Sequence, residues 1–184
     1  MKRSSVVQWI ILLAIPLLAL GVLRWTNSPL HAVTTDRTGS TIVCTARCDQ
    51  VVEALFFFDT TTGLLEGYVP ARRAGLPIQS RWLANVSEDM LALASQLGVE
   101  IPKSPRFTMV TGAIDAYKTQ GNIRPSFDLI FVTEIASGLS IAYIIPWNQA
   151  LHSNSTAFSA PLQIWATNRF ATGTPVADAG GTIE

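Results

Sequence analysis

The feature of this chain that most constrains its fold is a block of sixteen residues that occurs twice. Residues 54–69 read ALFFFDTTTGLLEGYV, and residues 129–144, at a constant offset of 75 positions, read LIFVTEIASGLSIAYI. In both copies a polar stretch ending in glycine separates two apolar runs. Two short apolar runs joined in this way are typical of a β-hairpin. The sequence therefore predicts one β-hairpin that is used twice.

Both copies predict the same kind of turn. The carboxylate of Asp59 can accept hydrogen bonds from amides two or three residues later, and Gly63 can adopt the left-handed conformation that reverses the chain. Glu134 and Gly138 occupy the equivalent positions in the second copy. Glutamate is expected to be the poorer cap because its side chain is longer. All four residues are interpreted as structural turn residues.

The first strand of each copy is almost wholly apolar, over residues 54–58 and 129–132. A strand that is buried on both faces has this composition, so both are predicted to lie near the centre of a covered sheet. The second strands have a more mixed composition and suit more peripheral positions. The two copies are expected to form equivalent halves of one sheet.

Between the copies the sequence predicts one helix, with Ser87 as its N-cap, Leu97 near its end and Gly98 as its C-cap. Further strands are expected over residues 41–46, 106–111 and 162–167, with Gly112 ending the second of these. The predicted fold class is α+β: a single N-terminal transmembrane helix, then a largely antiparallel sheet of about six strands covered by one main helix.

The N-terminus predicts a membrane anchor. Lys2 and Arg3 precede an uncharged run over residues 6–23, which spans about 27 Å as a helix. A cleaved signal peptide is the alternative interpretation. The basic N-terminus predicts a cytoplasmic start and an extracytoplasmic domain, at a bacterial inner membrane. The expected organisation is an anchor at 1–25, a polar tether at 26–40, an α+β domain at 41–170 and a disordered tail at 171–184.

Charge and cysteine content narrow the function classes. Without the three basic residues of the anchor region, ten basic residues face 13 acidic ones, which disfavours a nucleic-acid surface. Arg72, Arg73 and Arg81 form the densest basic group and are interpreted as a solvated loop. Cys44 and Cys48 are candidates for a local disulfide, with free or intermolecular thiols as the alternative. They lack the partners of a metal site.

No catalytic constellation is evident in the sequence. The chain has only His31 and His152, and His152 lies in a polar segment that is interpreted as a solvated loop. Asp59 and Glu134 occupy equivalent positions, but turn capping already accounts for them. No phosphate loop, dinucleotide fingerprint or metalloprotease motif is present, and no cofactor is expected.

The hairpin unit and three longer segments of the chain each resemble known proteins. The hairpin unit D-x-x-T-G-x-L-x-x-Y resembles the inner strands of a blade in quinoprotein-type β-propellers, but the chain is too short for the four or more blades of a propeller. Residues 53–69, 103–115 and 129–148 resemble a family of small, N-terminally membrane-anchored bacterial envelope proteins. That resemblance implies an anchored envelope protein and carries no activity with it. Cys44 and Cys48 depart from the family pattern.

The expected function is therefore non-enzymatic. The sequence favours a membrane-anchored accessory or scaffold subunit that binds other envelope proteins, in an oligomeric state that the sequence leaves open. The alternative is a small-ligand-binding module that uses the long loop predicted at 113–127 and the aromatic residues near Trp147. A membrane-anchored hydrolase is a third alternative.

Overall fold

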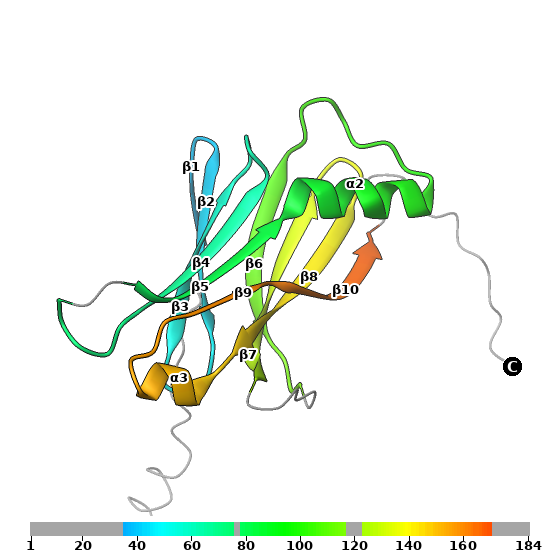
Figure 1. Ribbon diagram of the computed structural model, residues 1–184. Helices are drawn as coiled ribbons and strands as arrows, with labels where there is room; N and C mark the ends of the chain where they lie inside the picture. Colours follow the sequence, from blue (N-terminus) through cyan, green and yellow to red (C-terminus); the bar gives the residue numbers. More distant parts are fainter. Residues whose placement is uncertain (1–34, 76–77, 117–122, 171–184) are drawn as a thin grey trace, which may run out of the picture. The chain divides into compact units, whose positions relative to one another are not determined.

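The computed structural model describes residues 35–75, 78–116 and 123–170. These residues form two β-sheets and carry two helices (Figure 1). Sheet A has the strand order β1-β2-β3-β4-β5-β9, and sheet B has the order β10-β8-β7-β6. The elements are β1 (Thr35–Thr38), β2 (Thr41–Arg47), β3 (Glu53–Asp59), β4 (Leu64–Pro70), β5 (Ile78–Asn85), α2 (Val86–Leu97), β6 (Phe107–Ala113), β7 (Arg124–Glu134), β8 (Leu139–Trp147), α3 (Gln149–Ser153), β9 (Phe158–Pro161) and β10 (Gln163–Arg169).

Both predicted hairpins are present, but they lie in different sheets. The first copy forms the antiparallel pair β3 and β4 in sheet A, and the second forms β7 and β8 in sheet B. The mostly-sheet α+β class is confirmed, whereas the single sheet of about six strands is wrong. Sheet membership depends on long-range strand pairing, which a local hairpin pattern does not encode.

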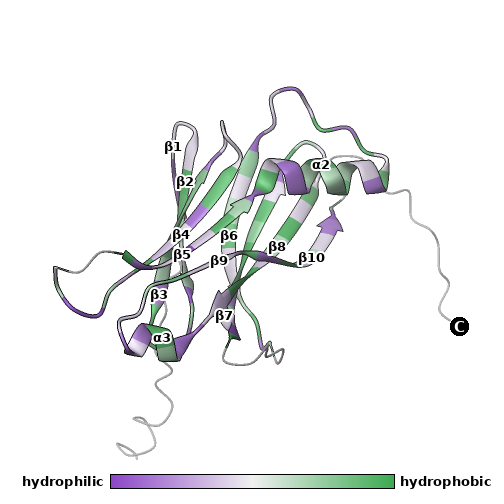
Figure 2. Cartoon of the chain, in the orientation of Figure 1, coloured by the Kyte–Doolittle hydropathy of each residue, from purple (hydrophilic) through white to green (hydrophobic). Residues whose placement is uncertain are grey.

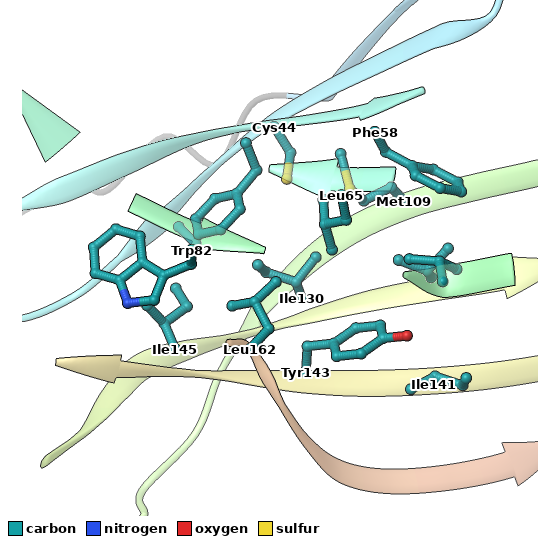
Figure 3. Packing of buried hydrophobic residues seen from close by; sticks show 14 of the residues in the cluster. Cys44, Phe58, Leu65, Trp82, Met109, Ile130, Ile141, Tyr143, Ile145 and Leu162 are labelled. Atoms are coloured by element: carbon teal, nitrogen blue, oxygen red, sulfur yellow. The ribbon is translucent and has the colours of Figure 1, made fainter. Parts of the chain in front are cut away.

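One hydrophobic core lies between the two sheets. Leu65 and Trp82 of sheet A and Ile130 and Tyr143 of sheet B are all 0% exposed and belong to the same buried cluster. Figure 3 shows these side chains pointing into the space between the two sheets. The sheets therefore stabilise each other by burying one apolar face each.

The two copies turn opposite faces toward this core. Phe56 is buried in the main core, whereas its equivalent Phe131 packs against a second, small cluster on the other face of sheet B. The tyrosines show the reverse arrangement, since Tyr143 is in the main core and Tyr68 is partly exposed. A strand has only two faces, so every aligned position of the first hairpin points the other way in the second.

The burial of individual strands differs from the prediction for this reason. β3 alternates between buried and exposed positions, and Leu55 and Phe57 are 40% and 38% exposed. β8, expected to be peripheral, is buried along its whole length, because Ile141, Tyr143 and Ile145 enter the main core while Ala142 and Ile144 belong to the small cluster on the other face. Figure 2 shows hydrophobic positions on β7 and β8 alike.

The predicted helix is present as α2, but its N-cap is Asn85 and not Ser87. The Asn85 side chain accepts a hydrogen bond from the Glu88 amide, so the helix begins one residue before Ser87. Gly98 ends the helix in the left-handed conformation, with φ of 62°, as predicted. The helix packs against β8 and β4, and Tyr143 donates a hydrogen bond of 2.7 Å to Asp89.

The predicted strands at 41–46, 106–111 and 162–167 correspond to β2, β6 and β10. β6 continues through Gly112, which was expected to end it. β1, β5, β9 and α3 were not predicted. β1 lies within the segment expected to be a polar tether, and β5 contains Arg81, which was interpreted as part of a solvated loop. The elements β1, β9 and α3 are short, polar or exposed, and such elements carry little periodic signal.

Several predictions concern residues outside the described ranges. The anchor at 1–25, residues 26–34 of the tether and the tail at 171–184 all lie there. Within the described ranges, no helix has both the length and the apolar character needed to cross a membrane.

Candidate functional site

The turns of the two hairpins have the predicted geometry. Gly63 and Gly138 have φ values of 76° and 73°, and each donates its amide to the carbonyl of the carboxylate residue four positions earlier, at 2.8 and 2.9 Å. Asp59 accepts hydrogen bonds from the Thr61 amide at 2.9 Å and the Thr62 hydroxyl at 3.1 Å. Asp59, Gly63, Glu134 and Gly138 therefore occupy the turn positions that the sequence predicts.

Glu134 caps its turn more fully than Asp59 does, contrary to expectation. It is 0% exposed and accepts hydrogen bonds from the amides of Ser137 at 2.6 Å, Arg106 at 3.0 Å and Ala136 at 3.2 Å. Burial alone raises the pKa of Glu134, but these hydrogen bonds outweigh it and lower the pKa overall. Each carboxylate is bound to the amides of its own turn, so neither is arranged for acid and base chemistry.

The outer face of sheet A carries an exposed apolar surface. The alternate positions of β2 to β5 that point away from the core pair across the strands, as Val43 with Phe57, Leu55 with Tyr68, and Glu66 with Leu83. All of them are half-buried or exposed, while their sequence neighbours are buried, apart from the half-buried Ala84 beside Leu83. The outer face is defined here as Val43, Leu55, Phe57, Leu64, Glu66, Tyr68, Arg81 and Leu83.

The polar groups of the outer face are concentrated at one place. Arg81 forms a salt bridge of 2.9 Å with Glu66, and its guanidinium carbon lies 5.9 Å from the centre of the Tyr68 ring. The Tyr68 hydroxyl donates to Glu66, and the ring packs edge-on against Phe57 with centroids 6.2 Å apart. One acidic and one basic group therefore lie side by side within an apolar surface.

This arrangement divides the basic group predicted from the sequence. Arg81 is paired on the outer face, while Arg72 and Arg73 are exposed in the segment after β4. The three arginines therefore do not form one basic surface.

Cys44 and Cys48 are free in the structure, and the local disulfide is not formed. Both are 1% exposed, and β2 is extended through Cys44, which holds residues four apart at about 13 Å along a strand. Burial raises the pKa of Cys44 to about 12 and that of Cys48 well above its usual value. Both are therefore thiols at neutral pH, and neither is activated as a nucleophile.

His152 is buried, contrary to its interpretation as a solvated loop residue. It lies in α3, with its ring centroid 5.0 Å from that of Trp147. Burial, followed by the charge of Arg72, lowers its pKa, whereas Asp49 acts in the opposite direction. Within the described ranges its Nδ1 atom has no hydrogen-bond partner. The lowered pKa keeps the ring neutral at pH 7, and its Nδ1 atom is not paired with a nucleophile.

The aromatic residue predicted for ligand binding, Trp147, lies at an open pocket. The pocket has a volume of about 390 Å³, and the start of β7 contributes Arg124, Pro125 and Phe127 to its wall. Residues 117–122 of the predicted binding loop lie outside the described ranges. The structure therefore brings Trp147 together with the described end of that loop.

Sequence reasoning missed the outer face because residues 55 and 57 were assigned to a strand buried on both sides. One signal was available: Gly67 lies opposite Phe56, and an added Cβ on Gly67 would come within 2.0 Å of the Phe56 ring. A glycine that makes room for a phenylalanine ring marks the packed face of the pair. The other face, with Phe57 and Glu66, is then the outer one.

Among the described residues, no group of three or more metal-ligating side chains is close enough to hold a metal ion. Comparison of the chain with protein-family models, with curated proteins and with solved structures gave no match.

Proposed function

We propose that this protein is a membrane-anchored accessory subunit of the bacterial envelope that binds another envelope protein through the outer face of sheet A. In this proposal residues 1–25 anchor the chain and the two-sheet domain lies outside the cytoplasm. The N-terminal sequence and the resemblance to anchored envelope proteins support the anchor. The chemistry of the outer face supports the docking role.

The observation that carries the proposal is the opposite orientation of the two hairpins. Leu55, Phe57 and Tyr68 on the outer face are the sequence equivalents of Ile130, Val132 and Tyr143, which are 0% exposed in the core. The first hairpin therefore exposes the face that its second copy buries. A contiguous exposed apolar surface is typical of a protein interaction site.

The partner surface is expected to be apolar, with hydrogen-bonding groups at its centre. Phe57 and Tyr68 supply aromatic area, which often dominates binding energy, and Glu66 and Arg81 can exchange their mutual salt bridge for contacts across the interface. A half-exposed salt bridge contributes little to stability, so this exchange costs the isolated domain little.

Site-specific photo-crosslinking in the native membrane tests the proposal. A photoreactive phenylalanine analogue at position 57 of the full chain is expected to crosslink to one protein of another mass. The matched control carries the analogue at position 91, because Leu91 is 61% exposed on α2 and is not part of the outer face. The control is expected to lack that product.

A charge substitution provides the second arm. Phe57→Glu should abolish co-purification of the crosslinked partner from mild detergent. Leu91→Glu should leave co-purification intact. Both variants should keep the wild-type melting temperature. Equal crosslinking at positions 57 and 91 would refute the docking face. Crosslinking of position 57 only to a second copy of the chain would also contradict the proposal, because the face would then mediate self-association.

A further inference from the structure

The pocket at Trp147 has the features of a small-molecule site and is separate from the outer face. Its volume of about 390 Å³ falls in the usual range for such sites, which is about 300–1,000 Å³. It lies between the segment that follows β2, the start of β7 and the junction of β8 with α3. Segments far apart in the sequence therefore converge on it.

An irregularity in strand pairing shapes one wall of the pocket. The β7–β8 register runs from Pro125 opposite Pro146 directly to Leu129 opposite Ile144, so the intervening residues of β7 bulge out. The Ser126 hydroxyl stabilises the bulge by donating to the Asp128 carbonyl at 2.6 Å and accepting from the Ile145 amide at 3.2 Å. Phe127 is left 39% exposed at the pocket. Bulges commonly redirect side chains at functional sites.

Asp49 fixes the segment after β2, which also lines the pocket. Its carboxylate accepts hydrogen bonds from the amides of Val51 at 2.9 Å and Val52 at 2.8 Å, and from the Trp147 indole at 3.0 Å. Behind the pocket, the side chain of Arg47 forms a bidentate pair with the buried carboxylate of Asp128, with its shortest contact at 2.7 Å. The pocket is therefore formed in advance of any ligand, which lowers the entropic cost of binding.

The charges of the pocket favour an anionic ligand. Three N–H donors already compensate the carboxylate of Asp49, whereas the exposed guanidinium of Arg124 has no salt-bridge partner among the described residues. A guanidinium presents a planar set of donors that matches a carboxylate. Among the described residues that line the pocket, Arg124 is the only basic one, so a second negative charge on the ligand would have no counter-charge there.

From these features we infer that the pocket binds a small organic monocarboxylate. Its carboxylate group pairs with Arg124, and its apolar body lies against Phe127, Pro125 and Val51. The polar side chains of Gln50 and Gln149 also line the pocket and supply further donors to the carboxylate. Sequence reasoning expected a ligand site near Trp147 as an alternative function, and the structure adds a chemical class for the ligand.

Titration calorimetry of the full chain in mild detergent tests this inference, with phenylacetate as the probe and phenylacetamide as its uncharged match. Wild type should bind phenylacetate, and Arg124→Gln should weaken that binding by about tenfold to a hundredfold, as expected for a lost charged hydrogen bond. Binding of phenylacetamide should be weaker in wild type and unchanged by Arg124→Gln. Arg73→Gln removes the same charge at an exposed position that does not line the pocket and should change neither affinity.

Phe127→Ala is the second variant and should weaken both probes alike, because it removes an apolar wall. No binding of phenylacetate to wild type at millimolar concentration would overturn the inference. So would equal binding by wild type and Arg124→Gln, or equal losses in Arg124→Gln and Arg73→Gln. None of these substitutions lies on the outer face, so the result is independent of the crosslinking experiment.

Discussion

At the scale of single residues, Glu134 caps its turn better than Asp59 does, although glutamate is locally the poorer turn cap. Its longer side chain is a disadvantage only if the turn amides are its sole partners. In the fold the same length lets the carboxylate also accept the Arg106 amide, just before β6. Glu134 therefore connects the β7–β8 turn to a neighbouring strand, whereas Asp59 serves only its own turn.

Substitution of Glu134 should accordingly cost more stability than substitution of Asp59. Glu134→Gln replaces one acceptor oxygen by a donor and leaves a buried amide without a partner, so a loss of about 1–3 kcal/mol is expected. Asp59→Asn should cost less because its turn is more accessible to water. Urea unfolding of both variants at neutral pH measures the difference, and a larger loss for Asp59→Asn would contradict this account.

The pH dependence of that difference follows from the lowered pKa of Glu134. A carboxyl group with a lowered pKa in the folded state stabilises the protein above its unfolded pKa, here 4.5, and loses that contribution as pH falls through the folded pKa. The stability gap between wild type and Glu134→Gln should therefore shrink below about pH 4.5. A gap that stays constant down to acid unfolding would show that the charge of Glu134 is not what stabilises the turn.

Gly63 is required both by its positive φ and by the close approach of Ser87, and experiment can separate these two constraints. It has positive φ, and an added Cβ would lie 2.0 Å from the Ser87 hydroxyl at the start of α2. Gly63→Ala should therefore cost at least about 1 kcal/mol. Gly39→Ala is the control, because Gly39 has φ of 59° and no atom within 4 Å of the added Cβ. Thermal melts in which both variants lose the same stability would exclude a role for the contact with Ser87.

At the scale of elements, the pair between Arg47 and Asp128 joins the two sheets. Arg47 ends β2, and the side chain of Asp128 in β7 is 1% exposed. Removing Arg47 leaves the buried carboxylate of Asp128 without its counter-charge, so Arg47→Ala should destabilise by about 3–5 kcal/mol. The exposed pair on the outer face offers a matched control, since Glu66→Ala should cost at most about 1 kcal/mol. Chemical denaturation that gives similar losses for both would show that the sheets do not depend on this pair.

The sequence predicted elements well where a local pattern determines them. Both hairpins, their glycine turns and the end of α2 follow from periodicity and turn chemistry. Failures occurred where the outcome depends on long-range pairing. β9 pairs in parallel with β5, and α3 buries His152, but neither element has a periodic pattern of its own.

At the scale of the whole molecule, the two copies of the repeat agree in their local structure and differ in the face that they bury. The copies share turn geometry and apolar positions, yet they bury opposite faces. The first strand of each hairpin is apolar on both sides, so only Gly67, opposite Phe56, indicated which face the first hairpin buries. The outer face follows from that orientation, and the bulge in β7 shapes the pocket at Trp147.

The connection between β9 and β10 has a consequence for how the domain folds. β9 completes sheet A, and after Leu162, whose amide donates to the Leu83 carbonyl at 2.8 Å, the chain enters β10 and completes sheet B. Sheet A begins first along the chain, but its last strand follows β6, β7 and β8 of sheet B in the sequence. Both sheets therefore gain their last strands from one short segment near the C-terminal end of the domain. Until that segment is synthesised, the outer edges of β5 and β8 lack their strand partners, and unpaired strand edges of this kind are prone to aggregation.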